Sequence, residues 1–292
     1  MKIFRKTLEV AKIKMSVESQ SEFEFSDRCK PFEKKIDDPQ VKFYIYRSEG
    51  IDFSKYKKIY DTKECEILCD NSKIAKIVYA DNRKNILWYM IYDKKLPDVY
   101  NIYIERKYEK DFLEINPFYF LSLSEFLINY DAIMLHGAVI EYKNRGIVFT
   151  APSGTGKSTQ ANLWNKYYGV NIINGDRAIV RKEFKYRVYG SPYAGSSKIY
   201  KQESSDLAAI IILKQAKENK VHCIGKKEAY MHIMSQISVS PWNKKVLEKQ
   251  MDWIVKLINT VPTYILECLP NKEAVDVLYN ELRYNKKIWE IE

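Results

Sequence analysis

The sequence predicts a mixed α/β protein whose core is built around a strand, a glycine-rich loop and a helix, preceded by a smaller β-rich N-terminal domain. The first observation behind this class is the apolar, strand-like run 147–150, which leads through the loop into the helix-like run 158–167. The second is a change of pattern near residue 110, before which short β-prone runs rich in tyrosine and isoleucine prevail. We therefore expect a β-rich domain over residues 1–110 and the α/β domain over 111–292.

The N-terminal domain contains three clear strand candidates, 41–46, 73–79 and 86–92. Residues 80–85, Ala-Asp-Asn-Arg-Lys-Asn, separate the last two and suit a hairpin turn. Such a domain could bind a peptide by strand addition or through its aromatic side chains. Aromatic residues in strands are, however, more often plain core.

The loop is the most informative segment of the chain. Gly154 and Gly156 allow the backbone N–H groups to surround a phosphate, and the following helix start adds its partial positive charge. In this pattern Lys157 reaches the β- and γ-phosphates of a nucleotide, and the Ser158 hydroxyl binds Mg²⁺. The segment matches the Walker A (P-loop) pattern except that Ala151 stands where the pattern has glycine. The predicted nucleotide-binding residues are Ser153, Gly154, Thr155, Gly156, Lys157, Ser158 and Thr159.

A second chemical feature follows the loop, where the apolar run 170–173 leads to Asn174, Gly175, Asp176 and Arg177. Ligands of α/β sheets gather at the carboxyl ends of strands, so Asp176 is placed to hold Mg²⁺ or to accept a proton from an attacking hydroxyl. An Asn-Gly-Asp sequence also suits a simple turn. Arg177 could steady a transferring phosphoryl group or pair with a surface carboxylate.

The remaining elements complete a layered α/β core. We expect helices over 118–130, 242–258 and 272–282, and strands over 134–140, 186–189, 207–213 and 263–268. The glycine-rich stretch 189–200 reads as a loop in which Lys198 grips an acceptor or the γ-phosphate, or as a surface turn. His232 and Cys268 fall in core elements and are expected to be structural.

Three motifs in order, residues 135–140 (LHGAVI), 153–159 (SGTGKST) and 174–176 (NGD), resemble the kinase core of the HPr kinase/phosphorylase family. That family shares its nucleotide-binding fold with the phosphoenolpyruvate carboxykinases. The resemblance implies that the P-loop holds ATP and Mg²⁺, that Asp176 activates the acceptor hydroxyl, and that His136 lies near the phosphates. Gly175 and Asp176 stand where HPr kinases have two adjacent aspartates, and no phosphorylase signature follows. The resemblance therefore does not extend to the reverse reaction or to HPr as the substrate.

These features predict an ATP-dependent kinase that transfers the γ-phosphate to a hydroxyl, expected to be serine, of a protein or peptide. Distant members of this kinase group accompany the biosynthesis of modified peptides, and the chain is similar to them in size. The alternatives are a nucleotide-switched ATPase or binding module and a carboxykinase-like metabolic enzyme. No base-reading motif distinguishes ATP from GTP. The family resemblance also implies a homo-oligomer.

Composition and charge limit the possible partners and the location of the protein. The net charge is +10, but the 48 Lys and Arg residues are scattered through every segment, so nucleic acid is not the expected partner. The longest apolar run, 207–213, is far shorter than the roughly 18 residues that a membrane helix needs, and a cytoplasmic location is expected. Five cysteines form no disulfide framework, and Cys65 and Cys69 lack a second pair of metal ligands.

Overall fold

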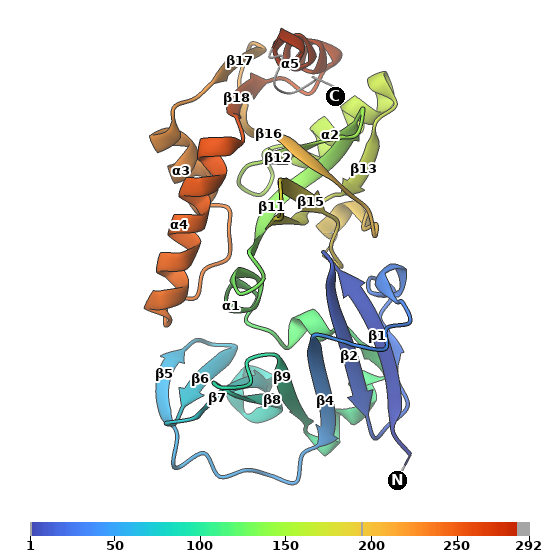
Figure 1. Ribbon diagram of the computed structural model, residues 1–292, viewed down its shortest axis with the longest axis vertical. Helices are drawn as coiled ribbons and strands as arrows, with labels where there is room; N and C mark the ends of the chain where they lie inside the picture. Colours follow the sequence, from blue (N-terminus) through green and yellow to red (C-terminus); the bar gives the residue numbers. More distant parts are fainter. Residues whose placement is uncertain (1, 194, 285–292) are drawn as a thin grey trace. The chain divides into compact units, whose positions relative to one another are not determined.

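The chain folds into two compact units, Met1–Leu121 and the part that begins at Ser122 (Figure 1). This computed structural model describes residues 2–193 and 195–284. Each unit has its own large sheet, and the α-helices belong to the second unit. The mixed α/β class expected from the sequence is confirmed. The division after residue 121 lies beyond the boundary near residue 110 that the change of pattern suggested.

The first unit is built on an eight-stranded sheet in the order β1-β2-β4-β9-β8-β7-β6-β5. Alternate residues of its strands face the core, as in β4, where Val41, Phe43 and Ile45 are buried and the residues between them are not. The strands are β1 Phe4–Val10, β2 Ile13–Ser19, β4 Val41–Arg47, β5 Lys57–Asp61, β6 Cys65–Cys69, β7 Lys73–Ala80, β8 Asn85–Asp93 and β9 Val99–Ile104. A small parallel pair, β3 (Glu24–Phe25) and β10 (Glu114–Ile115), accompanies it.

The predicted hairpin at 80–85 is confirmed, because β7 and β8 pair in antiparallel fashion up to Ala80 and Asn85. The three turn residues Asp81, Asn82 and Arg83 all have positive φ angles. Aspartate and asparagine tolerate this conformation better than most side chains, which explains the choice of residues at the first two positions.

The second unit contains an eight-stranded sheet in the order β12-β11-β14-β15-β16-β18-β17, with β13 paired to β11. Strand β12 also pairs with β16, so five of the strands close on themselves. Strands β12, β16 and β18 run parallel to one another. The strands are β11 Ala132–Tyr142, β12 Arg145–Thr150, β13 Asn171–Asn174, β14 Arg177–Lys182, β15 Tyr186–Tyr189, β16 Ser204–Gln215, β17 Lys220–Cys223 and β18 Thr263–Cys268.

Helices cover both faces of this sheet (Figure 1). Along β12, Phe149 packs in one core with Trp164 of α2 (Lys157–Tyr168) and with α5 (Lys272–Tyr284). Val148 faces the other core, with Ile233 of α3 (Lys226–Met234) and Ile254 of α4 (Lys244–Thr260). Side chains alternate along a strand, so β12 contributes to both cores in turn. Among the described residues, none of the helices has both the length and the apolar character needed to cross a membrane.

The helix predicted over 118–130 is wrong for its first half. The structure has a 3₁₀ turn at Pro117–Tyr119, followed by the short helix α1 at Leu123–Ile128. The carbonyls of Phe120 and Leu121 accept hydrogen bonds from Lys76 Nζ, at 3.3 and 3.1 Å, instead of continuing a helix. The other predicted helices are confirmed to within two residues, whereas α3 was not predicted.

Candidate functional site

A six-residue loop, Ala151–Gly156, connects the end of β12 to the start of α2. Gly154 and Gly156 have φ angles of +79° and +111°, which side chains rarely adopt. The N-cap residue of α2 is Gly156, which has no side chain that could cap the first N–H groups of the helix. N–H groups without a side-chain cap and the positive end of the helix dipole together favour an anion at this point.

Lys157 is the first residue of α2, and its side chain folds back over the loop. Its Nζ donates hydrogen bonds to the carbonyls of Ala151 at 2.9 Å and Pro152 at 3.1 Å. Burial lowers the pKa of Lys157, while the charge of Asp176 acts in the opposite direction. Ala151 is itself buried, so a small side chain suits the first position of the motif. The lysine is thus held beside the loop with its charge close to that of Asp176.

Asp176 and His136 form a hydrogen-bonded pair beside this lysine. The distance from His136 Nε2 to Asp176 Oδ1 is 3.2 Å, and Arg177 Nε lies 3.8 Å from Asp176 Oδ2. The pairing of β11 with β14 sets His136 opposite Arg177, and the Gly137 N–H donates to the Asp176 carbonyl at 2.7 Å. The hydrogen bond from His136 and the nearby positive charges hold the pKa of Asp176 below its usual range. The carboxylate is ionised at neutral pH, with 27% of its side chain exposed.

Asn174 fixes the turn that carries Asp176. This residue is fully buried, and its Oδ1 accepts hydrogen bonds from the backbone N–H groups of Asp176 at 3.0 Å and Arg177 at 2.9 Å. Its Nδ2 donates to the carbonyls of Ser191 and Tyr193, both at 3.1 Å. One amide side chain therefore ties the Asp176 turn to the loop that follows β15.

The glycine-rich loop after β15 contacts Asp176 directly. Gly195 has a φ of +55°, and a Cβ atom at this position would lie 2.7 Å from Asp176 Cγ. The Gly175 N–H also donates to the Ile199 carbonyl at 3.1 Å. Lys198 is exposed in the turn after the short 3₁₀ segment Gly195–Ser197, and Ala194 lies outside the described residues. The predicted loop is confirmed, whereas the role predicted for Lys198 stays a prediction.

The structure brings the predicted residues together around one loop. Lys157, Asp176, His136 and Arg177 form a connected group of polar side chains, and Ser158 Oγ lies 3.4 Å from the Gly175 carbonyl. Ser153, Gly154 and Thr155 lie in the loop, and Thr159 is exposed in the first turn of α2. Sequence reasoning named Asn174 only as a neighbour of Asp176, and it missed Gly195, for which the sequence carried no signal beyond a glycine-rich loop.

The donor set fits Mg²⁺ bound together with phosphates. Magnesium commonly uses one or two protein oxygens and completes its shell with water and phosphate oxygens. The Ser158 hydroxyl, which donates to the Gly175 carbonyl, and the carboxylate of the next residue, Asp176, offer two such oxygens. Within the described part of the chain, no group of three or more His, Cys, Asp or Glu residues could hold a metal by itself.

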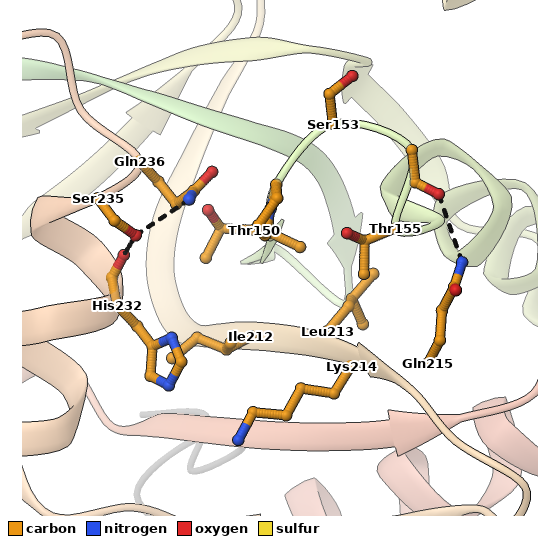
Figure 2. A pocket seen from close by; sticks show the side chains of 13 residues that line it. Thr150, Ser153, Thr155, Ile212, Leu213, Lys214, Gln215, His232, Ser235 and Gln236 are labelled. Carbon is orange, nitrogen blue, oxygen red and sulfur yellow. Dashed lines mark hydrogen bonds between the residues drawn. The ribbon is translucent and has the colours of Figure 1, made fainter.

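A pocket of about 520 Å³ adjoins the same loop (Figure 2). Its walls come from the loop residues Thr150–Thr155, from Ile212–Gln215 at the end of β16, and from the C-terminal end of α3. The α3 wall consists of His232, Ser235 and Gln236. His232, which we expected to be only structural, therefore faces a cavity. Gln215 Nε2 also donates to the Gly154 carbonyl at 3.4 Å, linking the β16 wall to the loop.

Comparisons with known proteins identify a family and solved structures that are distantly similar to this chain. The model of the family described as SynChlorMet cassette protein ScmC matches residues 118–270, just over half of the chain. The structure of the HPr(Ser) kinase/phosphatase from Coxiella burnetii is similar at a TM-score of 0.31 and 10% identity, covering 52% of this chain and 90% of that one. No curated protein matches the sequence.

Proposed function

The chain belongs to the family described as SynChlorMet cassette protein ScmC, and we propose that it is an ATP-dependent kinase acting on a serine hydroxyl of a protein or peptide. The observation that carries the proposal is the ionised Asp176, held by His136 at 3.2 Å beside a glycine-rich loop at a helix N-terminus. An anion site next to a carboxylate that can receive a proton is the combination that phosphoryl transfer to a hydroxyl requires.

The nucleotide phosphates would be held by the loop. The backbone N–H groups of residues 153–159, the start of α2 and the Lys157 ammonium supply positive potential in one place. Ser158 and Asp176 are the residues that would hold Mg²⁺, which neutralises phosphate charge when bound. The Lys157 ammonium donates hydrogen bonds to two loop carbonyls. Charged phosphate oxygens are stronger acceptors than these neutral carbonyls and can replace them when a nucleotide binds.

Asp176 would act on the acceptor. As the serine oxygen forms its bond to the γ-phosphorus, the bond from that phosphorus to the β-phosphate bridging oxygen breaks, ADP leaves, and the serine proton passes to the Asp176 carboxylate. The His136 hydrogen bond keeps this carboxylate oriented and charged. A lowered pKa makes Asp176 a weak base, which suits a loose transition state in which the hydroxyl loses its proton late. Arg177 adds positive charge beside the developing negative charge.

The first unit is a candidate for binding the peptide. Strand β5 forms one edge of its sheet, and Lys57, Lys58 and Ile59 in it are exposed. An exposed edge strand offers unpaired backbone groups to an extended peptide, and side-chain contacts then add specificity. This is the physical basis for proposing a peptide or protein, and not a small metabolite, as the acceptor.

The test is label transfer from γ-labelled Mg·ATP to a panel of an HPr-like protein, peptides encoded beside the gene, and free serine, with products identified by mass. Lys157→Ala should abolish transfer, because the loop loses its positive charge, while Lys166→Ala in an exposed position of the same helix should not. Full activity of Lys157→Ala contradicts the proposal. Nucleotide binding with slow hydrolysis and no transfer to any acceptor indicates a nucleotide-switched module instead.

Asp176→Asn separates two roles of the carboxylate. If Asp176 mainly receives the proton, turnover falls by orders of magnitude and the affinity for Mg·ATP changes little. If it mainly holds the metal, the affinity for Mg·ATP collapses while the affinity for ATP without Mg²⁺ is unchanged. Asp252→Asn, an exposed site on α4, is the matched control.

A further inference from the structure

We propose that the 520 Å³ pocket beside the loop binds the nucleoside part, base and ribose, of the nucleotide. This inference rests on the proposed function and adds to it the position of the base. The residues that would form the site are Thr150 and Ile212 at two strand ends, together with His232, Ser235 and Gln236 of the α3 end. Cavities of roughly 300 to 1,000 Å³ with mainly apolar walls and a few polar groups are typical of small-molecule sites.

The pocket and the hydrogen-bonded pair lie on opposite sides of the loop. In the sheet, Thr150 at the end of β12 lies opposite Gly137 of β11 on one side and Ile212 of β16 on the other. His136 belongs to β11, and the pocket is lined by the loop, β16 and the α3 end. Two pocket residues, Thr150 and Gln236, bond to the backbone of His136 at 2.8 and 2.9 Å. A nucleotide whose terminal phosphate faces Asp176 from within the loop would therefore extend its other end toward the pocket.

The two sites also belong to opposite faces of the sheet. Val148 and Ile210 pack with α3 and α4, so by strand alternation Thr150 and Ile212 face that same side. Ala138 packs with Trp164 of α2, and His136, two residues earlier, shares its face. Carboxyl ends of parallel strands such as β12 and β16 are where ligands bind in α/β sheets.

The walls of the pocket suit a flat base with polar edges. Figure 2 shows Thr150 and Thr155 on one side of the cavity and His232, Ile212 and Lys214 across from them. The His232 imidazole offers both a ring face and hydrogen-bonding nitrogens, whereas Ile212 is only 3% exposed and adds little surface. The Ser235 hydroxyl donates to the His232 carbonyl at 2.7 Å and accepts from Gln236 Nε2 at 3.0 Å. The second amide hydrogen and the carbonyl oxygen of Gln236 can bond to base or ribose edges.

An acceptor serine would not fit this place. Its hydroxyl must come within hydrogen-bonding distance of the Asp176 carboxylate, and that carboxylate belongs to the β11 side of the loop, with His136 and the Gly195 loop. The pocket lining includes none of Asp176, His136 or Ser158. A nucleoside is joined to the phosphates and not to the acceptor, so it can occupy this pocket while the acceptor lies beside Asp176.

The test compares binding of Mg·ATP with binding of Mg·tripolyphosphate, which lacks a nucleoside, by calorimetry on the full chain. Two variants alter the pocket without changing its formal charge: His232→Ala removes a wall, and Ser235→Trp fills the cavity. We expect each to weaken Mg·ATP binding at least about tenfold and to leave tripolyphosphate binding unchanged. His222→Ala, at an exposed histidine of β17, is the matched control and should change neither.

The outcomes separate this inference from the kinase proposal. Wild-type protein that binds tripolyphosphate as tightly as ATP, or pocket variants that weaken both ligands equally, would overturn the nucleoside site and leave the loop assignment intact. Variants with unchanged ATP affinity but a raised KM for the acceptor would assign the pocket to the acceptor and overturn the inference. A wild-type protein that binds neither ligand overturns the proposed function and the nucleoside site together. Unfolding midpoints of the variants near that of wild type establish that the pocket variants are folded.

Discussion

Replacing the fully buried Asn174 with alanine tests whether one amide side chain holds the turn that carries Asp176. The substitution removes four hydrogen bonds of 2.9 to 3.1 Å. Two backbone N–H groups, those of Asp176 and Arg177, and two carbonyls, those of Ser191 and Tyr193, lose this partner. The alanine side chain is too short and has no polar atom to replace any of these bonds.

The expected loss of stability follows from the number of bonds and the burial. A hydrogen bond contributes about 1 kcal/mol net, and a buried group left without a partner costs about 1 to 3 kcal/mol. Because some of the freed groups can reach water after a small movement of the loop, we expect the free energy of unfolding to fall by about 3 to 5 kcal/mol. Phosphoryl transfer should fall by more than the unfolded fraction explains, because the Asp176 carboxylate is no longer held in place.

Urea denaturation followed by tryptophan fluorescence measures the first effect, and label transfer from γ-labelled ATP under native conditions measures the second. Asn171→Ala on the same strand is the matched control, since among the described residues this side chain bonds to the exposed Glu203 and the half-buried Lys201 side chains and to no buried group. Its loss should be below about 1 kcal/mol. An Asn174→Ala variant with the stability and turnover of the Asn171→Ala variant would refute the reasoning.

Two further predictions concern the surroundings of Asp176. Gly195→Ala places a Cβ 2.7 Å from Asp176 Cγ, so turnover should fall at least about tenfold in the transfer assay; Gly50→Ala, with a φ of +85° but no atom near its Cβ, controls for backbone strain. His136→Gln removes the largest cause of the lowered pKa of Asp176, so the acidic limb of the pH dependence of kcat/KM should move to higher pH. A carboxyl group whose pKa is lowered by folding stabilises the fold at pH values above its ordinary pKa of about 3.9. This stabilisation is lost as the pH falls through the pKa of the folded state. The difference in stability between wild type and His136→Gln should therefore shrink toward low pH. An unmoved limb, with His222→Gln as reference, would contradict the contact between His136 and Asp176 as the cause.

Much of the local architecture follows from residue patterns. The strands at 186–189 and 263–268 have the predicted bounds, and the loop between β12 and α2 is marked by its two glycines and the lysine after them. These features depend on alternation and backbone conformation, which neighbouring residues determine. The failed first half of the 118–130 helix shows the limit, because Lys76, more than 40 residues earlier in the chain, binds the carbonyls that a helix would have used.

The assembled site was decided by tertiary structure. The sequence marked His136, Lys157 and Asp176 as chemical groups, but only the pairing of β11 with β14 brings the histidine to the carboxylate. The close approach of Gly195, the four bonds of Asn174 and the pocket at the end of α3 join segments distant in the sequence. Short-range patterns specify conformation, whereas contacts across a sheet depend on register and packing, which no single segment contains.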